Sequence, residues 1–346
     1  RSKAISGASR AKAVPGPKVP ETGGEGRQVI LSMRPQRTCR MSLASSPTLQ
    51  KPPMTARMWA LLFVLGIIWG GSFFSVSIAV KEIPPLTLVL IRVAVAALAL
   101  HLYLFARGPS FALARPYAGW FLMMGLLNNV VPFSLMFIGQ TAIGAGLASV
   151  LNATTPFWTL LVVGFVFRFE TPTLNKLIGV VVGIAGTAVM IGPGLAADIG
   201  GPVWAKFALI GTALSYAFSF VVSRRFTGLP PVLVATGQLT ASTLMMIPIV
   251  LYADGLDGFL HAGAGAWTAA LALALVATAF AYLIFFELIR TAGQSNTSLV
   301  TMITPVSAVL LGSVFLGERL ELFELAGMAL IGLGLVTIDG RLFRRR

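Results

Sequence analysis

Residues 59–80 read WALLFVLGIIWGGSFFSVSIAV, a run of twenty-two residues without a charged side chain. A helix needs about 20 consecutive apolar residues to cross the hydrocarbon core of a bilayer. A helix also lets an open-ended segment satisfy all of its backbone hydrogen bonds inside lipid. This run therefore predicts a transmembrane helix.

Nine further apolar runs of similar length follow. They lie at about 85–105, 117–139, 143–167, 174–192, 203–223, 230–252, 266–289, 295–317 and 321–340. Short links with Pro and Gly, such as Pro84-Pro85 and Pro230-Pro231, separate several of them. The sequence predicts an all-α integral membrane protein with ten transmembrane helices.

The composition agrees with a lipid-facing exterior. Of the 346 residues, 56% are hydrophobic and 11% are charged, against about 25% charged residues in a soluble domain. The formal charge of +14 is concentrated in residues 1–57, which carry eleven Lys/Arg and two acidic residues. A basic tail on an apolar body is not the basic face of a nucleic-acid-binding protein. We expect the lipid bilayer and a small-molecule substrate as partners, and no nucleic acid.

The two ends of the chain have a different composition from its body. Residues 1–57 are rich in Ser, Pro, Gly and Arg and predict a disordered basic tail, with a transit peptide as the alternative. Residues 341–346 form a short basic tail. The chain has a single cysteine, Cys39, two histidines and no phosphate-binding motif GxxxxGK[ST]. We therefore expect no cofactor, no metal site and no ATP hydrolysis.

Lys and Arg are distributed unequally between the predicted loops. If the N-terminus is inside, the cytoplasmic loops hold thirteen Lys/Arg and the outer loops hold three, leaving out Arg92 and the residues before Lys51. Positive residues favour the cytoplasmic side. The distribution predicts a multi-pass protein of the cytoplasmic membrane with both termini inside.

The two halves of the chain resemble each other. Ile83-Pro-Pro-Leu86 returns as Leu229-Pro-Pro-Val232, 146 residues later, and Thr155-Pro156 returns as Thr304-Pro305, 149 residues later. Five such matches occur in the same order. The alternative is that they arise by chance, because membrane helices are built from few types of residue. The pattern predicts one repeat at 58–192 and a second at 203–340. Five helices per repeat give the two copies opposite orientations in the membrane, as in many secondary transporters.

With these motifs the chain resembles the EamA family of the drug/metabolite transporter superfamily. The resemblance rests on Trp69-Gly-Gly-Ser72, Pro84-Pro85 with Arg92, and the Pro156 and Pro305 segments, and it covers about 59–340. It implies a ten-helix inner-membrane carrier, often an exporter of amino acids, related metabolites or drugs. The second copy differs from the first, since Tyr216 replaces Trp69 and Gln238 stands where Arg92 stands.

Polar and aromatic residues in the middle of the spans are the candidates for substrate binding, because a polar group without a partner is costly in hydrocarbon. They are Trp69, Ser72, Arg92, Asn128, Asn129, Asn152, Thr155, Tyr216, Ser219, Tyr282, Thr301 and Thr304. We expect six of them to line one central cavity: Trp69, Asn128, Asn129, Thr155, Tyr216 and Thr304.

Each candidate also has a structural interpretation. The two asparagines could join helices to one another, and the threonines could bond to their own helix at a proline kink. The aromatic residues could simply pack in the core. Arg92 could anchor the structure or extend to the membrane surface instead of attracting an anionic group.

Glu287 is the leading carboxylate candidate if transport is coupled to protons, although an ion pair with Arg290, three residues on, is the simpler interpretation. The motifs Gly66-xxx-Gly70 and Gly179-xxx-Gly183 allow close helix packing. They could join the two repeats or pair two copies in a homodimer.

The sequence favours a secondary carrier for small organic solutes, and the resemblance favours export. A nucleotide-sugar or phosphorylated-metabolite antiporter would need several basic residues in the cavity, where Arg92 alone qualifies. A membrane enzyme would need a cluster such as His261 with Asp254 and Asp257. A channel would need a ring-forming filter, which the sequence does not show.

Overall fold

In the computed structural model of the protein, residues 55–169, 173–197, 201–255, 257, 261–292, 297 and 299–339 are described, without the side chains of 190–197, 302 and 339. Of the two predicted tails, 1–54 and 341–346 lie outside this set, as does Glu170. The first helix already begins at Ala56, so the last two residues assigned to the N-terminal tail are helical.

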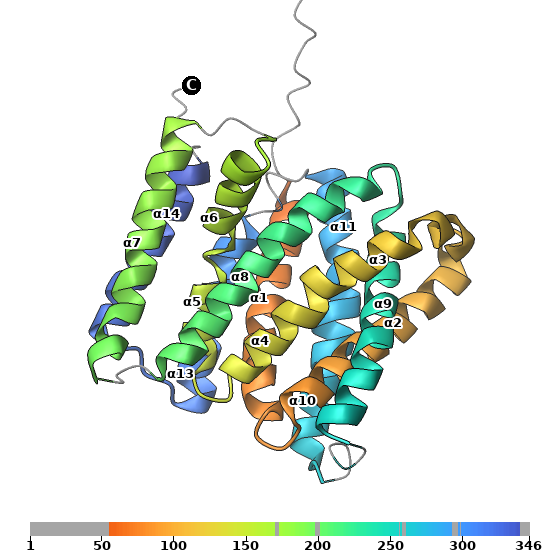
Figure 1. The fold of residues 1–346 in the computed structure, drawn as a ribbon, viewed down its shortest axis with the longest axis horizontal. Coiled ribbons are helices and arrows are strands. Elements are labelled where there is room, and N and C mark those ends of the chain that lie inside the picture. Colours follow the sequence, from red (N-terminus) through yellow and green to blue (C-terminus); the bar gives the residue numbers. More distant parts are fainter. Residues whose placement is uncertain are drawn as a thin grey trace, which may run out of the picture. The chain divides into compact units, whose positions relative to one another are not determined.

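The regular elements of the described chain are all helices, and none of the described residues forms a strand (Figure 1). The first half holds α1 (Ala56–Ala79), α2 (Pro85–Arg107), η1 (Phe111–Tyr117), α3 (Ala118–Gly125), η2 (Leu126–Val130), α4 (Val131–Gly139), α5 (Ala145–Asn152), α6 (Thr155–Leu160), η3 (Leu161–Val166) and α7 (Leu174–Ala197). The second half holds α8 (Val203–Ser223), η4 (Arg224–Phe226), α9 (Pro231–Ala253), α10 (Ala264–Ala274), η6 (Leu275–Phe280), α11 (Ala281–Thr291), α13 (Val300–Leu316) and α14 (Leu322–Asp339). The all-helical class is thus confirmed.

Every predicted run falls on one of these helices or on a stack of consecutive ones. Within the described residues, seven helical segments are long and apolar enough to cross a membrane. The other three apolar helices are shorter, at Leu174–Val189, Ile303–Leu316 and Leu322–Ile338. The number of ten crossings therefore stays a prediction.

Prolines and a glycine mark several helix ends, as the sequence indicated. Pro85 and Pro231 occupy the first positions of α2 and α9, where the missing N–H costs nothing because it would have no partner in the helix. Gly317 follows α13 with a φ of 67°, a left-handed conformation that glycine adopts without steric penalty.

Three segments with π-helical geometry interrupt the expected continuous helices. They are η2, η3 and η6. The starts of η2 and η6, Leu126 and Leu275, are 149 residues apart, which equals the spacing of Thr155 and Thr304. A π turn inserts a residue into the helix and is often found at functional sites. The repeat therefore extends to a backbone irregularity that the amino-acid pattern did not predict.

The packing of the helices keeps the same pattern when the two halves are exchanged. α1 packs against α13 in the second half, just as α8 packs against α5 and α6 in the first. α1 contacts the α10–α11 segment, as α8 contacts the α3–α4 segment, while α2 packs on α9 and α7 on α14. Figure 1 shows the α7–α14 pair at one edge. The halves therefore interlock as two copies of one unit.

Small residues allow the closest of these contacts. A Cβ atom on Gly179 would lie 2.7 Å from the carbonyl oxygen of Gly334 in α14, and one on Gly70 would lie 2.8 Å from the amide nitrogen of Ala308 in α13. Both small-residue motifs thus join the two halves within one chain. A homodimer, which they could also have formed, stays a prediction.

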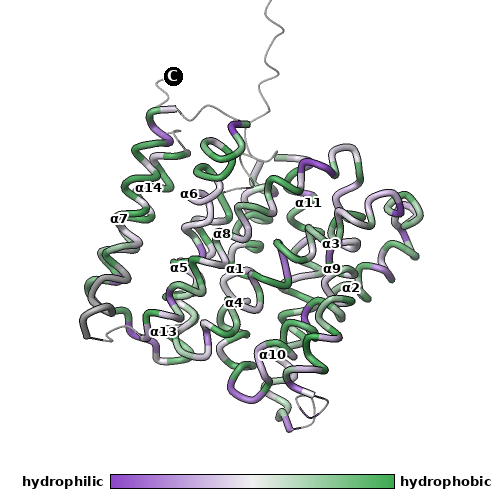
Figure 2. The backbone as a smooth tube through the Cα atoms, in the orientation of Figure 1, coloured by the Kyte–Doolittle hydropathy of each residue, from purple (hydrophilic) through white to green (hydrophobic). Residues whose placement is uncertain are grey.

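The surface along the helices is apolar. Large hydrophobic side chains such as Phe105, Leu322 and Leu174 are exposed over 94%, 84% and 70% of their area. Figure 2 shows hydrophobic residues along the helix lengths and hydrophilic ones mainly at the ends and turns. An exterior of this kind suits lipid rather than water.

We name the two ends of the bundle by the first helix. The Ala56 end, where α1 begins, is the upper end in Figure 1, and the Ala79 end, where α1 finishes, is the lower one. α8 finishes and α9 begins at the Ala56 end, whereas α2 and α5 begin at the Ala79 end.

Candidate functional site

A cavity of about 580 Å³ lies between the two halves, within the roughly 300–1,000 Å³ typical of small-molecule sites. Eleven of the twelve candidate residues line it: Trp69, Ser72, Arg92, Asn128, Asn152, Thr155, Tyr216, Ser219, Tyr282, Thr301 and Thr304. The structure thus brings these eleven residues together around one cavity. Their part in substrate binding stays a prediction.

Asn129, the twelfth candidate, does not line the cavity. Its side chain is fully buried and donates a hydrogen bond from Nδ2 to Oγ of Ser242 in α9, at 2.9 Å. Asn128 lines the cavity, whereas Asn129, the next residue, points toward α9. For Asn129 the expectation was wrong, and the alternative of a bond between helices is correct.

Asn128 belongs to a chain of polar side chains on the cavity wall. Its Oδ1 accepts a hydrogen bond from Ser219 at 3.0 Å, and its Nδ2 donates to Oε1 of Gln238 at 3.2 Å. Nε2 of Gln238 in turn donates to the hydroxyl of Tyr282 at 3.4 Å. Four helical segments are joined by this chain. Gln238 was not among the candidates, although its place opposite Arg92 in the repeat was a signal.

Arg92 lies at the cavity wall in the interior of the bundle. It is 6% exposed, and its Nε donates to Oγ1 of Thr278 in η6 at 3.0 Å. Its guanidinium carbon lies 3.9 Å from the ring centroid of Phe133, a distance that gives a cation–π attraction. Arg92 therefore does not extend to the membrane surface. Thr278 was missed because a lone threonine in an apolar run carries no signal of its own.

The threonines before the two prolines bond to their own helices. Thr155 donates to the carbonyl oxygen of Asn152 at 2.6 Å, which Pro156, lacking an N–H, cannot reach. Thr304 donates to the carbonyl oxygen of Val300 at 2.9 Å. Thr155 thus bonds the carbonyl that Pro156 leaves free, whereas Thr304 bonds the carbonyl one residue before the corresponding position in the second half. Both side chains also line the cavity.

Trp69 and Tyr216 occupy matched, half-buried places on the wall. Trp69 lies beside Phe285, with ring centroids 5.5 Å apart. Ser72 donates to the carbonyl oxygen of Trp69 at 2.6 Å, and Ser219 donates to that of Tyr216 at 2.8 Å. The same local bond thus occurs in both copies, and the aromatic faces stay free to line the cavity.

The cavity reaches one end of the bundle only. On α8 and the turn after it, the lining runs from Tyr216 to Thr227, and on α9 it begins at Pro231, so it extends to the Ala56 end. Toward the Ala79 end it stops at Phe73 on α1 and at Met136 on α4.

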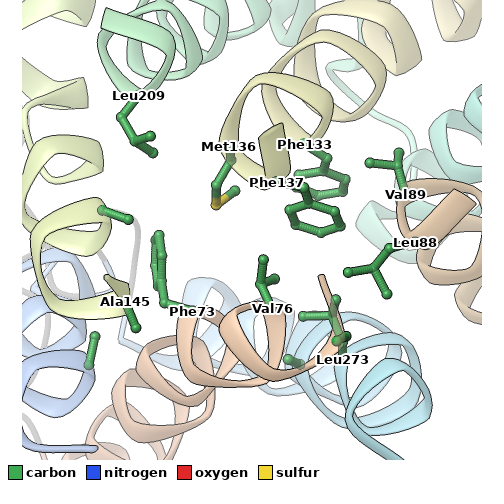
Figure 3. Packing of buried hydrophobic residues seen from close by; sticks show 14 of the residues in the cluster. Phe73, Val76, Leu88, Val89, Phe133, Met136, Phe137, Ala145, Leu209 and Leu273 are labelled. Carbon is green, nitrogen blue, oxygen red and sulfur yellow. The ribbon is translucent and has the colours of Figure 1, made fainter. Parts of the chain in front are cut away.

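Buried apolar side chains close the Ala79 end. Phe73, Val76, Phe133, Met136 and Phe137 gather there in one cluster (Figure 3). The rings of Phe133 and Phe137 are nearly parallel, with centroids 6.1 Å apart. Because these residues belong to α1 and α4, the closure consists mainly of first-half side chains.

A polar contact reinforces this closure. Gln140, directly after α4, donates from Nε2 to the carbonyl oxygen of Phe73 at 2.9 Å and to Oγ of Ser77 at 3.0 Å. Glu318, after α13, accepts hydrogen bonds from the backbone N–H groups of Ala145 and Gly146 at 2.7 and 3.0 Å. A carboxylate suits the N-terminus of α5, because the helix dipole is positive there.

The residues around the open end are the counterparts of those at the closed end. Phe73 matches Phe220 at an offset of 147, and Phe133 and Met136 match Tyr282 and Phe285 at an offset of 149. All six line the cavity. The same set of positions thus closes one end in the first half and borders the open end in the second.

Glu287 lies outside the cavity. Its carboxylate pairs with Arg290 at 2.9 Å and with Arg57 at 3.5 Å, and both arginine side chains are mostly exposed. The simpler interpretation of a helical ion pair is confirmed. Among the described residues that line the cavity, Arg92 is the only charged one.

Comparison with known proteins agrees with this architecture. The model of the EamA-like transporter family matches residues 57–192 and again 203–338. An uncharacterized inner membrane transporter, YedA of Escherichia coli K12, is 29% identical over 297 residues, which cover 83% of this chain and 92% of YedA. The transporter YvbV of Bacillus subtilis is 27% identical over 280 residues, covering 78% and 88% of the two chains.

A protein of Salmonella typhimurium described as a "probable amino-acid metabolite efflux pump" is 27% identical over 301 residues, which cover 83% of this chain and 95% of that protein. A solved crystal structure of a protein without a stated function has a TM-score of 0.61 at 20% identity and covers 85% of this chain and 100% of its own. This last likeness concerns the fold. On the two family matches and the paired halves, the chain is a member of the EamA-like transporter family.

Proposed function

We propose that the protein is a secondary carrier of small organic solutes that works by alternating access across the cytoplasmic membrane. One observation carries this proposal: the cavity between the two halves opens at a single end, and matched residues of the repeats border its open and closed ends. A second conformation in which the halves exchange their roles would open the same cavity at the other end.

The proposed orientation follows from the positive residues. With ten crossings and both termini in the cytoplasm, Lys and Arg gather on the cytoplasmic side. The Ala56 end is then cytoplasmic, and the conformation described here is open toward the cytoplasm. Export is the proposed direction, supported by the description of the Salmonella relative as a probable efflux pump.

The experiment that tests this function needs no knowledge of the solute. Cys39 is replaced by Ser, and Thr155, half-buried on the cavity wall, is replaced by Cys. A membrane-impermeant thiol reagent is applied to right-side-out and to inside-out vesicles. Thr141→Cys and Thr227→Cys, exposed near the Ala79 and Ala56 ends, report the sidedness of each preparation.

Alternating access predicts that Thr155→Cys reacts in both preparations and reacts faster from the cytoplasmic face. Each control variant reacts from one face only. Reaction of Thr155→Cys from a single face under all conditions would contradict a carrier. Fast reaction from both faces together with a steady ion leak would indicate a channel.

A further inference from the structure

The cavity wall presents one cationic group that the protein itself leaves incompletely bonded. Arg92 is 6% exposed, and its Nη1 is buried without a hydrogen-bond partner among the described residues. Its described contacts are the hydrogen bond from Nε to Thr278 and the ring faces of Phe133 and Phe137. A guanidinium has five N–H donors, and this arrangement leaves part of them without an acceptor.

None of the described carboxylates lies on the cavity wall with Arg92, and five of them are bonded elsewhere. These five are Glu82, Asp254, Glu287, Glu318 and Glu324. A buried charge without a counter-charge is costly, and removing water from it increases the attraction of any anion that arrives. The planar donors of arginine match the two oxygens of a carboxylate.

The remainder of the wall determines what such an anion carries. Aromatic rings from both halves surround the cavity, among them Trp69, Tyr216, Phe285 and Phe286. Tyr282 stacks on Phe286 with ring centroids 5.8 Å apart. Rings of this kind bury apolar or aromatic groups favourably. No Asp or Glu lies on the described wall to attract a cation.

The two halves differ at the decisive position. Gln238 is the counterpart of Arg92, and its side chain is already bonded to Asn128 and Tyr282. The cavity wall thus has a charged side chain, Arg92, in the first half. At the matched place in the second half it has a neutral side chain, Gln238, that is already bonded within the protein. One positive charge suits a monoanion better than a phosphate ester, which carries about two negative charges at neutral pH.

From this geometry we infer that Arg92 is the anion-binding residue of the cavity and that the solute is a small monocarboxylate with an apolar, aromatic-compatible body. The inference rests on the proposed carrier function and names its substrate class. Arg92 binds the carboxylate through its free donors, while the aromatic walls enclose the apolar part of the solute.

The test is a set of binding titrations with compounds of one shape and different charge. Isothermal titration calorimetry of the purified full-length protein in detergent uses 3-phenylpropanoate, 3-phenylpropanamide, 3-phenylpropylamine and phenyl phosphate. For a compound of this size we expect the carboxylate to bind with a Kd at or below about 5 mM. The amide should bind about 10- to 100-fold more weakly, since it lacks the charge-assisted hydrogen bonds.

The variant Arg92→Gln should remove this preference and bring the carboxylate and the amide to nearly equal affinity. Glutamine occupies the matched position, Gln238, so the fold already accommodates that side chain there. Arg92→Lys keeps the charge without the planar donors and should retain part of the preference. Arg225→Gln removes an exposed positive charge outside the cavity and should leave the preference unchanged.

Three results would overturn the inference: no binding of the carboxylate in this range, equal binding of carboxylate and amide by the unaltered protein, or an unchanged preference in Arg92→Gln. Tighter binding of the amine or of phenyl phosphate would also do so. The carrier function is tested separately by the two-sided labelling of Thr155→Cys. If the carboxylate does not bind but Thr155→Cys is labelled from both faces, the proposed substrate class is refuted and the proposed carrier function is not.

Discussion

Adjacent polar residues in one membrane helix have different tasks here. Asn128 lies on the cavity wall within the polar chain, whereas Asn129 bonds Ser242 in the neighbouring helix. Sequence alone could nominate both, because an amide in mid-span is costly unless bonded. It could not separate them, because the direction of each side chain depends on the π turn of η2 and on the placement of α9.

Replacing each asparagine by alanine separates the two tasks. Asn129→Ala leaves the Ser242 hydroxyl without this amide and should lower the free energy of unfolding by about 1–2 kcal/mol. Asn128→Ala should change solute binding more than stability, since Asn128 is only partly buried. Thermal unfolding in detergent measures the first effect. Equal melting temperatures for Asn129→Ala and the parent protein would contradict this assignment.

Glu287 offers a second residue-level prediction. Because it pairs with the exposed Arg290 and Arg57 outside the cavity, Glu287→Gln should change stability by no more than about 0.5 kcal/mol. Transport in vesicles with and without a pH gradient should respond to the gradient as in the parent protein. Loss of the gradient's effect in this variant would identify Glu287 as the coupling carboxylate after all.

At the level of helices, hydropathy was sufficient to locate the long apolar helices of the described chain. Apolar runs must form helices in lipid, so their positions could be predicted from composition. The kink before Pro156, where α5 ends and α6 begins, was also expected from the proline. The π segments could not be predicted, because they are small backbone adjustments made during packing. Gln238 and Thr278 acquire a task only across the interface between the halves, which one helix at a time does not reveal.

The contact between α7 and α14 can be tested with two glycines. A Cβ atom on Gly186 would lie 2.8 Å from the carbonyl oxygen of Gly327, whereas one on Gly332 would have nothing within 4 Å. Gly186→Leu should therefore destabilise the protein by about 1–3 kcal/mol through overpacking. Gly332→Leu on the same helix pair is the matched control and should be nearly neutral. If both variants unfold at the temperature of the parent, the α7–α14 contact is wrongly described.

For the whole molecule, the duplicated sequence becomes a duplicated structure whose two halves differ in conformation. Helix packing, the π segments η2 and η6 and much of the cavity lining have counterparts in the other half. The break between α5 and α6 and the π segment η3 correspond to one continuous helix, α13. The conformation of the two halves is not the same, because the first half closes the Ala79 end while the second borders the open end. Two equivalent units in unequal conformations imply a second state with the roles reversed. The internal repeat was visible in the sequence, but which end is closed depends on packing and could not be predicted from it.

Distances between spin labels at two matched pairs of residues measure this exchange in lipid nanodiscs. Val80 and Thr141 flank the closed Ala79 end, beside the bonds of Gln140, and their counterparts Thr227 and Arg290 lie at the Ala56 end, where the cavity opens. Double electron–electron resonance should reveal two populations. In one the Val80–Thr141 distance is short and the Thr227–Arg290 distance is long, and in the other this order is reversed. One fixed distance for each pair under all conditions, or two distances that lengthen together, would contradict alternating access by exchange of the two repeats.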